Sequence, residues 1–422
     1  MIRRARGALF SAGAGAGALV VVALGVAVAC STPYGEAPTT DKSDGPNPGG
    51  QEAGNDPTPG DAPCKLYGPV GQPEKDDDPT VEVPPFIMAV DNLIISETTP
   101  SIGTLGFDID GVCTCDTRAG NAHGGESSCK PKGSPICDAD GGIDNSFGKL
   151  ISTFDTFGSF ADMTKVKERI NSGRQTLLVY MRRYNGRAND RDVEIGLLPS
   201  DGVRTAGCAG STQNSDGNYN PGWCGDDAWT TVPEGQIADG TPIALANGYV
   251  NNYRFVVNLP ATARVPLGPV PLEVGTPIIT GKLIPLDENL NPRPPGDPPA
   301  TEKQKRLYKV EEGQLVGRMV VQSLLATLGA ADVSGGNDRL CQSILYVQLR
   351  KEICAAIDIA RAPSLDFQSY ACDALSASLG FTAQPAVRGA AYLEQLAPND
   401  CLPVNGAPKV PTQYAPDYNC PP

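Results

Sequence analysis

Acidic side chains gather in one short stretch of the chain, residues 106–148, which begins GFDIDGVCTC and ends CDADGGIDNSFG. Calcium takes oxygen ligands from carboxylates and amides that are closely spaced on tight turns. The stretch therefore predicts a calcium site. The residues of suitable type and spacing are Asp108, Asp110, Asp138, Asp140, Asp144 and Asn145.

This pattern is not that of an EF-hand, and a second interpretation stays open. Counted from Asp138, the sixth loop position holds Ile143 where an EF-hand has glycine, and the twelfth holds Lys149 where it has glutamate. Asp and Asn side chains also accept hydrogen bonds from their own turn backbone, which needs no ion. Calcium is the one cofactor to which the sequence points, and an aspartate-rich turn without a cation is the alternative.

A second group of polar and aromatic residues lies in the segment CAGSTQNSDGNYNPGWCGDDAW, residues 208–229, which contains both tryptophans of the chain. Aromatic faces beside amides and carboxylates suit the CH face and the hydroxyl groups of a sugar. The residues that could contact such a ligand are Tyr219, Trp223, Asp226, Asp227 and Trp229. The alternative is that the tryptophans are core residues, Trp229 in particular.

Residues for catalysis are few. The single histidine, His123, lies in the loop GNAHGGESSC, and neither a G-x-S-x-G nor an H-E-x-x-H motif occurs. A glycosidase needs only two carboxylates, but no spacing singles out a pair among the many Asp and Glu residues. We therefore expect a protein that is not an enzyme, with a secreted polysaccharide-acting hydrolase as the alternative.

Cysteines are numerous enough to define a disulfide framework. Besides Cys30 the chain contains Cys64, Cys113, Cys115, Cys129, Cys137, Cys208, Cys224, Cys341, Cys354, Cys372, Cys401 and Cys420. This even number in an exported chain predicts six disulfides. A zinc site is a poor alternative, because one histidine cannot supply mixed Cys/His ligand sets and Cys113-x-Cys115 lacks the usual two-residue gap.

Two features of the sequence limit which cysteines can form disulfides with each other. Cys208 and Cys224 should close a surface loop. Cys341 and Cys354 are expected on one helix, about 20 Å apart at ~1.5 Å per residue, so they should not pair with each other. Each should instead reach Cys372, Cys401 or Cys420.

The elements that must hold these residues are mostly strands. Short apolar runs with turn signals every 8–12 residues, and much Gly and Pro, predict a mainly β, disulfide-rich fold: an antiparallel β-sandwich, jelly-roll or lectin-like, with a few helices. Strands are expected at 176–185, 191–200 and 372–387, among others.

Three helices are expected. The first, 162–172, begins at Asp162 and ends at Gly173, and the second lies near 320–328. The third, 339–360, begins after Asp338 and has an apolar stripe that should pack on the sheet, formed by Leu340, Ile344, Val347, Ile353 and Ile357.

The first thirty residues have the layout of an export signal: three arginines, an apolar run, and small residues before Cys30. The sequence Ala27-Val28-Ala29-Cys30 resembles the lipobox of bacterial lipoproteins. That resemblance implies lipid attachment to the Cys30 thiol and cleavage before it. Ser31, where an Asp would imply inner-membrane retention, favours the outer membrane or cell surface. An ordinary signal peptide cut after Ala29 is the alternative.

The expected organisation has five parts: a signal peptide (1–29), a disordered Pro/Gly-rich tether (30–80), a β-sandwich core (81–290), a Pro-rich loop (291–306), and a helical, disulfide-linked part that returns to the sandwich (307–422). Residues 66–70 interrupt the tether and should dock on the folded part. A net charge of −14 argues against nucleic acid as a partner. The expected partners are the lipid bilayer, through the anchor, and a glycan or an envelope protein.

The lipobox and tether, together with GFDIDGVCTC, CDADGGIDNSFG, NDRDVEIG and CDALSASLGFTA, resemble uncharacterised secreted lipoproteins of myxobacteria. The resemblance extends in order over most of the chain after the signal peptide. It implies an exported location and a single secreted fold, and it implies no reaction.

Overall fold

The computed structural model describes the chain from Leu66 onward. Within that part the positions not described are 79, 96–97, 100–102, 118–124, 155–162, 233–240, 243, 261, 266–271, 295–307, 332–338, 393–400, 402, 405–406, 409–412, 416 and 421–422. The expected signal peptide, Cys30, Cys64 and His123 therefore lie outside the described residues.

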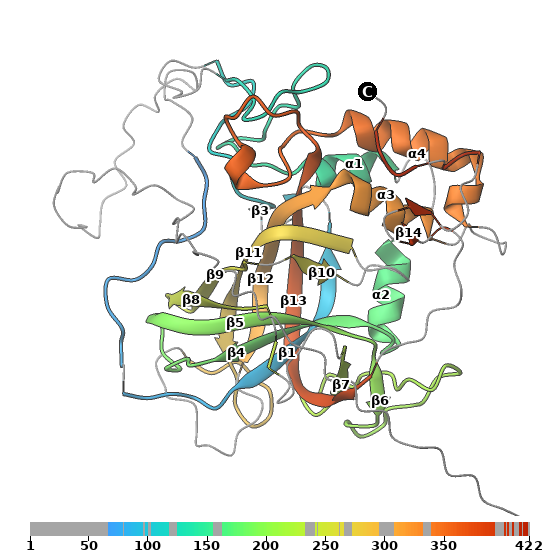
Figure 1. Ribbon diagram of the computed structural model, residues 1–422. Helices are drawn as coiled ribbons and strands as arrows, with labels where there is room; N and C mark the ends of the chain where they lie inside the picture. The colour runs from blue at the N-terminus through green and yellow to red at the C-terminus, as the bar shows by residue number, and fades with distance from the viewer. Residues whose placement is uncertain are drawn as a thin grey trace, which may run out of the picture. The chain divides into compact units, whose positions relative to one another are not determined.

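Eight long strands form a closed antiparallel β-barrel (Figure 1). Seven of them pair with the barrel strand that follows along the chain, and the first pairs with the last to close the ring. The strands are β1 (Phe86–Ile94), β4 (Thr176–Arg182), β5 (Asp190–Ser200), β8 (Leu245–Asn251), β9 (Arg254–Asn258), β11 (Leu272–Pro285), β12 (Tyr308–Val320) and β13 (Ala374–Ala391).

The predicted β-sandwich is therefore wrong. β1 pairs with β4 on one side and with β13 on the other, so the eight strands close into a ring, and the other two sheets among the described residues have only two strands each. A β-bulge around Asp91 lies on this closing seam, and the Asp91 carboxylate accepts hydrogen bonds from Thr382 Oγ1 (2.6 Å) and Gln384 Nε2 (3.0 Å). The two architectures share short antiparallel strands and turn spacing, so the sequence pattern does not separate them.

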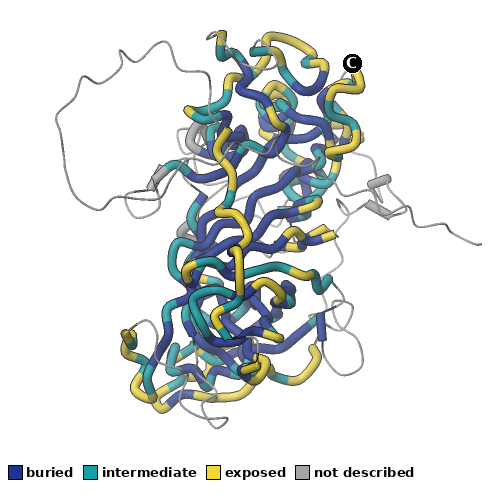
Figure 2. The backbone as a smooth tube through the Cα atoms, turned by 90° about the vertical axis from the view of Figure 1, so that its left-hand side faces the viewer, coloured by how far each residue is buried: buried dark blue, intermediate teal, exposed yellow. Residues whose placement is uncertain are grey.

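Some barrel strands, such as β4, are apolar and buried on both faces, because both faces of the barrel wall are covered there. On β4, Leu177, Val179 and Met181 belong to the core inside the barrel, whereas Leu178 and Tyr180 pack outside it with Trp229. Side chains such as Met88 and Phe255 fill the interior. Figure 2 shows the barrel strands as largely buried chain.

Shorter strands and, among the described residues, four α-helices accompany the barrel. The strands are β2 (Thr98–Thr99), β3 (Gly103–Thr104), β6 (Val203–Thr205), β7 (Ala228–Thr231), β10 (Ala263–Val265), β14 (Pro403–Val404) and β15 (Ala407–Pro408). The helices are α1 (Ser146–Phe154), α2 (Met163–Asn171), α3 (Val321–Gly329) and α4 (Ile344–Ala355). None of the helices in the described part of the chain is long and apolar enough to cross a membrane.

The first two helix predictions are confirmed by α2 and α3, and α1 was not predicted. The third is wrong in its extent. Ser343 has an extended backbone, so a 3₁₀ turn (Leu340–Gln342) and α4 replace one continuous helix, and the Ser343 side chain accepts a hydrogen bond from Leu345 N. The predicted stripe is confirmed only in part. Leu340 and Ile353 are buried in the core, but Ile344 and Val347 are exposed, and Tyr346 and Leu349 are buried instead.

Five disulfides join described cysteines: Cys115–Cys137, Cys129–Cys372, Cys208–Cys224, Cys341–Cys401 and Cys354–Cys420. The predicted Cys208–Cys224 bond is confirmed, as are the separate partners of Cys341 and Cys354. Such bonds form and persist in oxidising compartments, so they indicate an exported protein.

The chain before β1 lies against the outside of the barrel, as predicted for residues 66–70. We call residues 66–78 the strap. Tyr67 donates its N–H to Gly141 O (2.8 Å) and accepts from Asp108 N (2.8 Å), and further along Asn189 donates its N–H to Asp77 (2.9 Å). In Figure 2 the strap crosses the buried strands as mostly exposed chain.

A buried guanidinium links three segments above the outer face of β12. Arg318 makes a bidentate ion pair with the Asp366 carboxylate (2.8 and 2.6 Å). It also donates to the carbonyl oxygens of Ala360 (2.7 Å) and Ile109 (2.8 Å). The exposed fractions of the two charged side chains are only 2% and 8%. The pair therefore holds the 106–148 segment and the chain after α4 on the barrel.

Replacing Arg318 by leucine should destabilise the protein strongly, because the substitution leaves a buried carboxylate and two carbonyl groups without their donor. We expect a loss of about 3–5 kcal/mol in the free energy of unfolding. Guanidinium chloride unfolding with the disulfides intact measures it. The control is Arg264→Leu, at an exposed ion pair with Glu273, which should cost ~0–1 kcal/mol. Equal losses in both variants would contradict the role of Arg318.

Candidate cation site and ligand pocket

Three of the predicted calcium ligands converge. One carboxylate oxygen from each of Asp108, Asp110 and Asp144 lies within 4.8 Å of the other two. The chain between the first two is held by its apolar neighbours, because Phe107 and Ile109 pack on the outer face of the barrel. We call Asp108, Asp110 and Asp144, with Asp138 and Asp358 beside them, the aspartate cluster.

Turn backbone supplies hydrogen bonds to these carboxylates. Asp144 Oδ2 accepts from Ile109 N (2.8 Å), Asp108 Oδ1 from Gly111 N (2.7 Å), and Asp110 Oδ1 from Val112 N (3.1 Å). This is the turn capping that was the alternative to a metal site. The two interpretations are compatible, because each carboxylate has two oxygens and several lone pairs, so capping leaves capacity for a cation.

Two more aspartates lie beside these three, and one of them, Asp358, was not predicted from the sequence. Asp138 accepts from Thr114 N (2.6 Å) and hydrogen-bonds Asp144. Asp358 follows α4, and its Oδ1 accepts from Ser146 Oγ (2.9 Å) and Ser376 N (2.8 Å). Asp358 is distant in the chain and has no metal-ligand spacing to the others, so only the fold brings it to the cluster.

Burial and mutual repulsion make the ionised form of the cluster costly. Burial is the largest cause in each case, and it raises the pKa of Asp108 and of Asp138 to about 7 and that of Asp358 to about 6. The pKa of Asp144 also lies well above its usual value, because burial and the charges of Asp110, Asp138 and Asp358 all raise it. At neutral pH such a group holds protons, or a cation that replaces them.

Two of the predicted ligands lie elsewhere. Asp140 is exposed, and with Asp116 and Asp138 it lines an open pocket of about 290 Å³ beside the cluster. The Asn145 side chain instead starts α1, where its Oδ1 accepts from Gly148 N (3.0 Å) and Ser378 N (3.1 Å). Carboxylate oxygens on turn backbone fit a hard cation such as calcium, and Asp108, Asp110 and Asp144 are the residues that would hold it.

The aromatic residues of the 208–229 segment hold the loop together. Trp229 is fully buried and its ring centroid lies 5.7 Å from that of Trp223. The buried Asp227 accepts from Trp223 N (2.7 Å) and Gly222 N (3.1 Å). Tyr219 packs against the same outer apolar cluster as Trp229, and Asp226 is half-buried. The Trp229 face is therefore inaccessible to a ligand, whereas the Cys208–Cys224 loop itself is well fixed.

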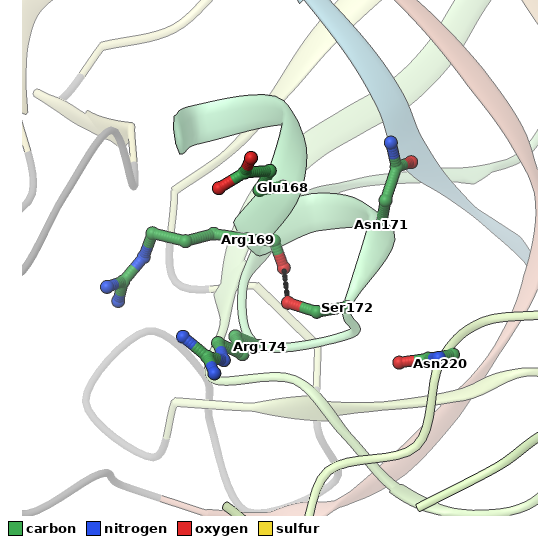
Figure 3. Close-up of a pocket in the computed structure, with 6 residues that line it drawn as sticks. All are labelled: Glu168, Arg169, Asn171, Ser172, Arg174 and Asn220. Atoms are coloured by element: carbon green, nitrogen blue, oxygen red, sulfur yellow. Dashed lines mark hydrogen bonds between the residues drawn. The ribbon is translucent and has the colours of Figure 1, made fainter. Parts of the chain in front are cut away.

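A polar pocket lies where this loop meets the carboxyl end of α2 (Figure 3). Its volume is about 590 Å³, and its described lining residues are Glu168, Arg169, Asn171, Ser172, Arg174 and Asn220. We call it the arginine pocket. It contains none of the ligand residues predicted from the sequence. Asn220 stands next to the predicted Tyr219, which was the one available signal.

Comparison with protein-family models, with curated proteins and with solved structures found no match to this chain. The class that can be stated is therefore structural: an exported, disulfide-bonded, closed eight-stranded antiparallel barrel.

The stability of the protein should fall with rising pH in the absence of calcium and should depend much less on pH in its presence. The raised carboxyl pKa values mean that the folded state binds more protons than the unfolded state above pH 3.8, so in EDTA stability should fall as pH rises through about 7. Calcium would bind the ionised carboxylates, so the calcium-induced rise in melting temperature should grow over the same range.

Thermal unfolding with disulfides intact, in EDTA and in millimolar calcium at pH 5, 6 and 7, measures both trends. The Asp144→Asn variant should lose most of the calcium response. The Asp140→Asn variant is the matched control, because Asp140 lies outside the cluster, and it should respond like the parent. Identical melting in both buffers at every pH would leave the cluster as a proton-sharing turn without a cation.

Proposed function

We propose that this protein is an exported, lipid-anchored binding protein of the bacterial envelope, without catalytic activity, whose barrel presents a glycan-binding site. The observation that carries the proposal is the arginine pocket. It is a hollow of ligand size lined by polar side chains and built on a cross-linked loop of a rigid barrel. An envelope protein is the other class of partner that could bind a polar pocket on a cross-linked loop.

The strap supports the proposed anchoring. A barrel tethered through Cys30 needs a spacer that is fixed at the barrel end, and the hydrogen bonds of Tyr67 and Asp77 supply that fixed point. The residues between Cys30 and Leu66, rich in Pro, Gly, Ser and Thr, have the composition of a spacer. Outer-membrane or cell-surface attachment follows from the lipobox-like sequence and Ser31.

Calcium has a structural role in this proposal. The 106–148 segment is held by the Cys115–Cys137 and Cys129–Cys372 disulfides among others, and by the Arg318 network. A cation on Asp108, Asp110 and Asp144 would add a further cross-link and would offset the cost of burying their charges.

A hydrolase acting on polysaccharide is the alternative, and one observation favours it. Asp138 lines the 290 Å³ pocket together with Asp116 and Asp140, and its pKa is raised to about 7 by burial. A carboxyl group with a pKa near 7 suits the general acid of glycoside hydrolysis, a reaction that uses a second carboxyl group nearby.

A glycan array and a panel of chromogenic glycosides separate these two functions. We expect reproducible binding to a restricted set of glycans and no turnover. Turnover that disappears in Asp138→Asn while melting is unchanged would establish the hydrolase instead. Silence in both assays would contradict the glycan partner and would leave an envelope protein as the ligand to be sought.

The Cys30→Ser variant should abolish incorporation of labelled fatty acid and should move the protein from the membrane fraction to the soluble fraction. Cys208→Ser/Cys224→Ser is the control, because it removes two cysteines that form a disulfide but leaves Cys30 intact, and it should still be labelled. Continued labelling and membrane fractionation of the Cys30 variant would show that the lipobox interpretation is wrong.

A further inference from the structure

The chemistry of the arginine pocket restricts its ligand. All six described lining residues have polar or charged side chains, with two guanidinium groups and one carboxylate among them. Asp216 pairs with Arg174 from outside the lining, so positive and negative charges are balanced here, and the pocket offers guanidinium donors rather than an excess of positive charge. A wall of this kind offers hydrogen bonds and a charge but no apolar side chain, so it suits a hydroxyl-rich anion better than an apolar molecule.

The two arginines are positioned by neighbours outside the pocket. Arg169 Nε donates to the buried Gln175 Oε1 (2.8 Å), and Arg174 pairs with Asp216 of the disulfide-closed loop (2.7 Å). Arg174 Nε is itself buried and has no hydrogen-bond partner among the described residues. In Figure 3 the two guanidinium groups lie on one side of the pocket, with Asn171 and Asn220 on the other.

The walls of the pocket are joined to each other, which reduces the cost of ordering them on binding. Asn214 Nδ2 of the loop donates to Ser172 O at the end of α2 (2.9 Å), and Val203 N donates to Gly173 O (2.9 Å). Gly173 has a positive φ of 66°, and a Cβ there would lie 1.9 Å from Tyr219 O. The helix end and the loop therefore meet in direct backbone contact.

We propose that the arginine pocket binds a carboxylate-bearing saccharide, such as a hexuronate unit of an acidic polysaccharide. Arg169 and Arg174 bind the carboxylate, because a guanidinium presents paired N–H donors that match its two oxygens. The Asn171 and Asn220 amides, the Ser172 hydroxyl and the Glu168 carboxylate bind sugar hydroxyls. This inference rests on the proposed glycan-binding function and names the class of glycan.

Isothermal titration of the full chain in detergent, at fixed ionic strength and without added calcium, tests it. The probes are trigalacturonate and its fully methyl-esterified form, which has the same sugars without the negative charge. We expect trigalacturonate to bind at least tenfold more tightly than the ester, since a charge-assisted hydrogen bond contributes about 1.5–3 kcal/mol. Arg169→Gln and Arg174→Gln should each weaken trigalacturonate binding by about tenfold or more.

Arg264→Gln is the matched control, because Arg264 is an exposed arginine on β10, outside the pocket lining. This variant should bind trigalacturonate as tightly as the parent protein does. Melting curves verify that each variant is folded, and Arg174→Lys, which keeps the charge, should recover part of the affinity.

Equal binding of acid and ester, or inorganic phosphate binding as tightly as trigalacturonate, would overturn the assignment. Binding of another glycan on the array that both arginine variants retain would refute the pocket but leave the glycan-binding function standing. Absence of binding to every glycan would refute both.

Discussion

The outer layer of this protein depends on one buried ion pair, Arg318–Asp366. Arg318 belongs to β12, and its guanidinium contacts two parts of the chain that are far away in sequence: the 106–148 segment through Ile109, and the chain after α4 through Ala360 and Asp366. A charge so deeply buried is tolerated only when its hydrogen bonds are satisfied, so these segments can be placed in very few ways. The Cys129–Cys372 bond then fixes the same arrangement covalently.

The aspartate cluster follows from that placement. Once Ile109 and Asp366 are held, Asp108, Asp110 and Asp144 meet on the outer face of the barrel. Burial raises the pKa of Asp110, and the charge of Asp366 adds to this effect. The nearby Arg318 guanidinium lowers the same pKa, but by less. The region is thus held by polar bonds and disulfides in addition to the packing of Phe107 and Ile109. Its stability should respond to protons and cations more than that of the barrel, whose interior is filled by side chains such as Met88 and Phe255.

Sequence patterns predicted local structure well and closure poorly. The periodicity of apolar residues and the helix-capping residues predicted α2, α3, β4 and β5. The spacing of cysteines predicted the Cys208–Cys224 disulfide. The barrel depends on the pairing of β1 with β13. These strands are far apart in the chain, so no local sequence pattern predicts that they pair. At the site, closely spaced Asp108 and Asp110 could be chosen by type, whereas Asp358 and Arg318 come to the cluster only through tertiary structure. The arginine pocket was missed for the same reason, since Arg174 and Asn220 meet only when α2 packs on the loop.

The strap and β1 would resist force differently. β1 is hydrogen-bonded on both sides within the closed barrel, so pulling it out would break two ladders at once. The hydrogen bonds of the strap, at Tyr67 and Asp77, are fewer and lie apart, so they would open one after another. The 106–148 segment, to which Tyr67 bonds, would stay in place when the strap opens, because its cysteines are disulfide-bonded.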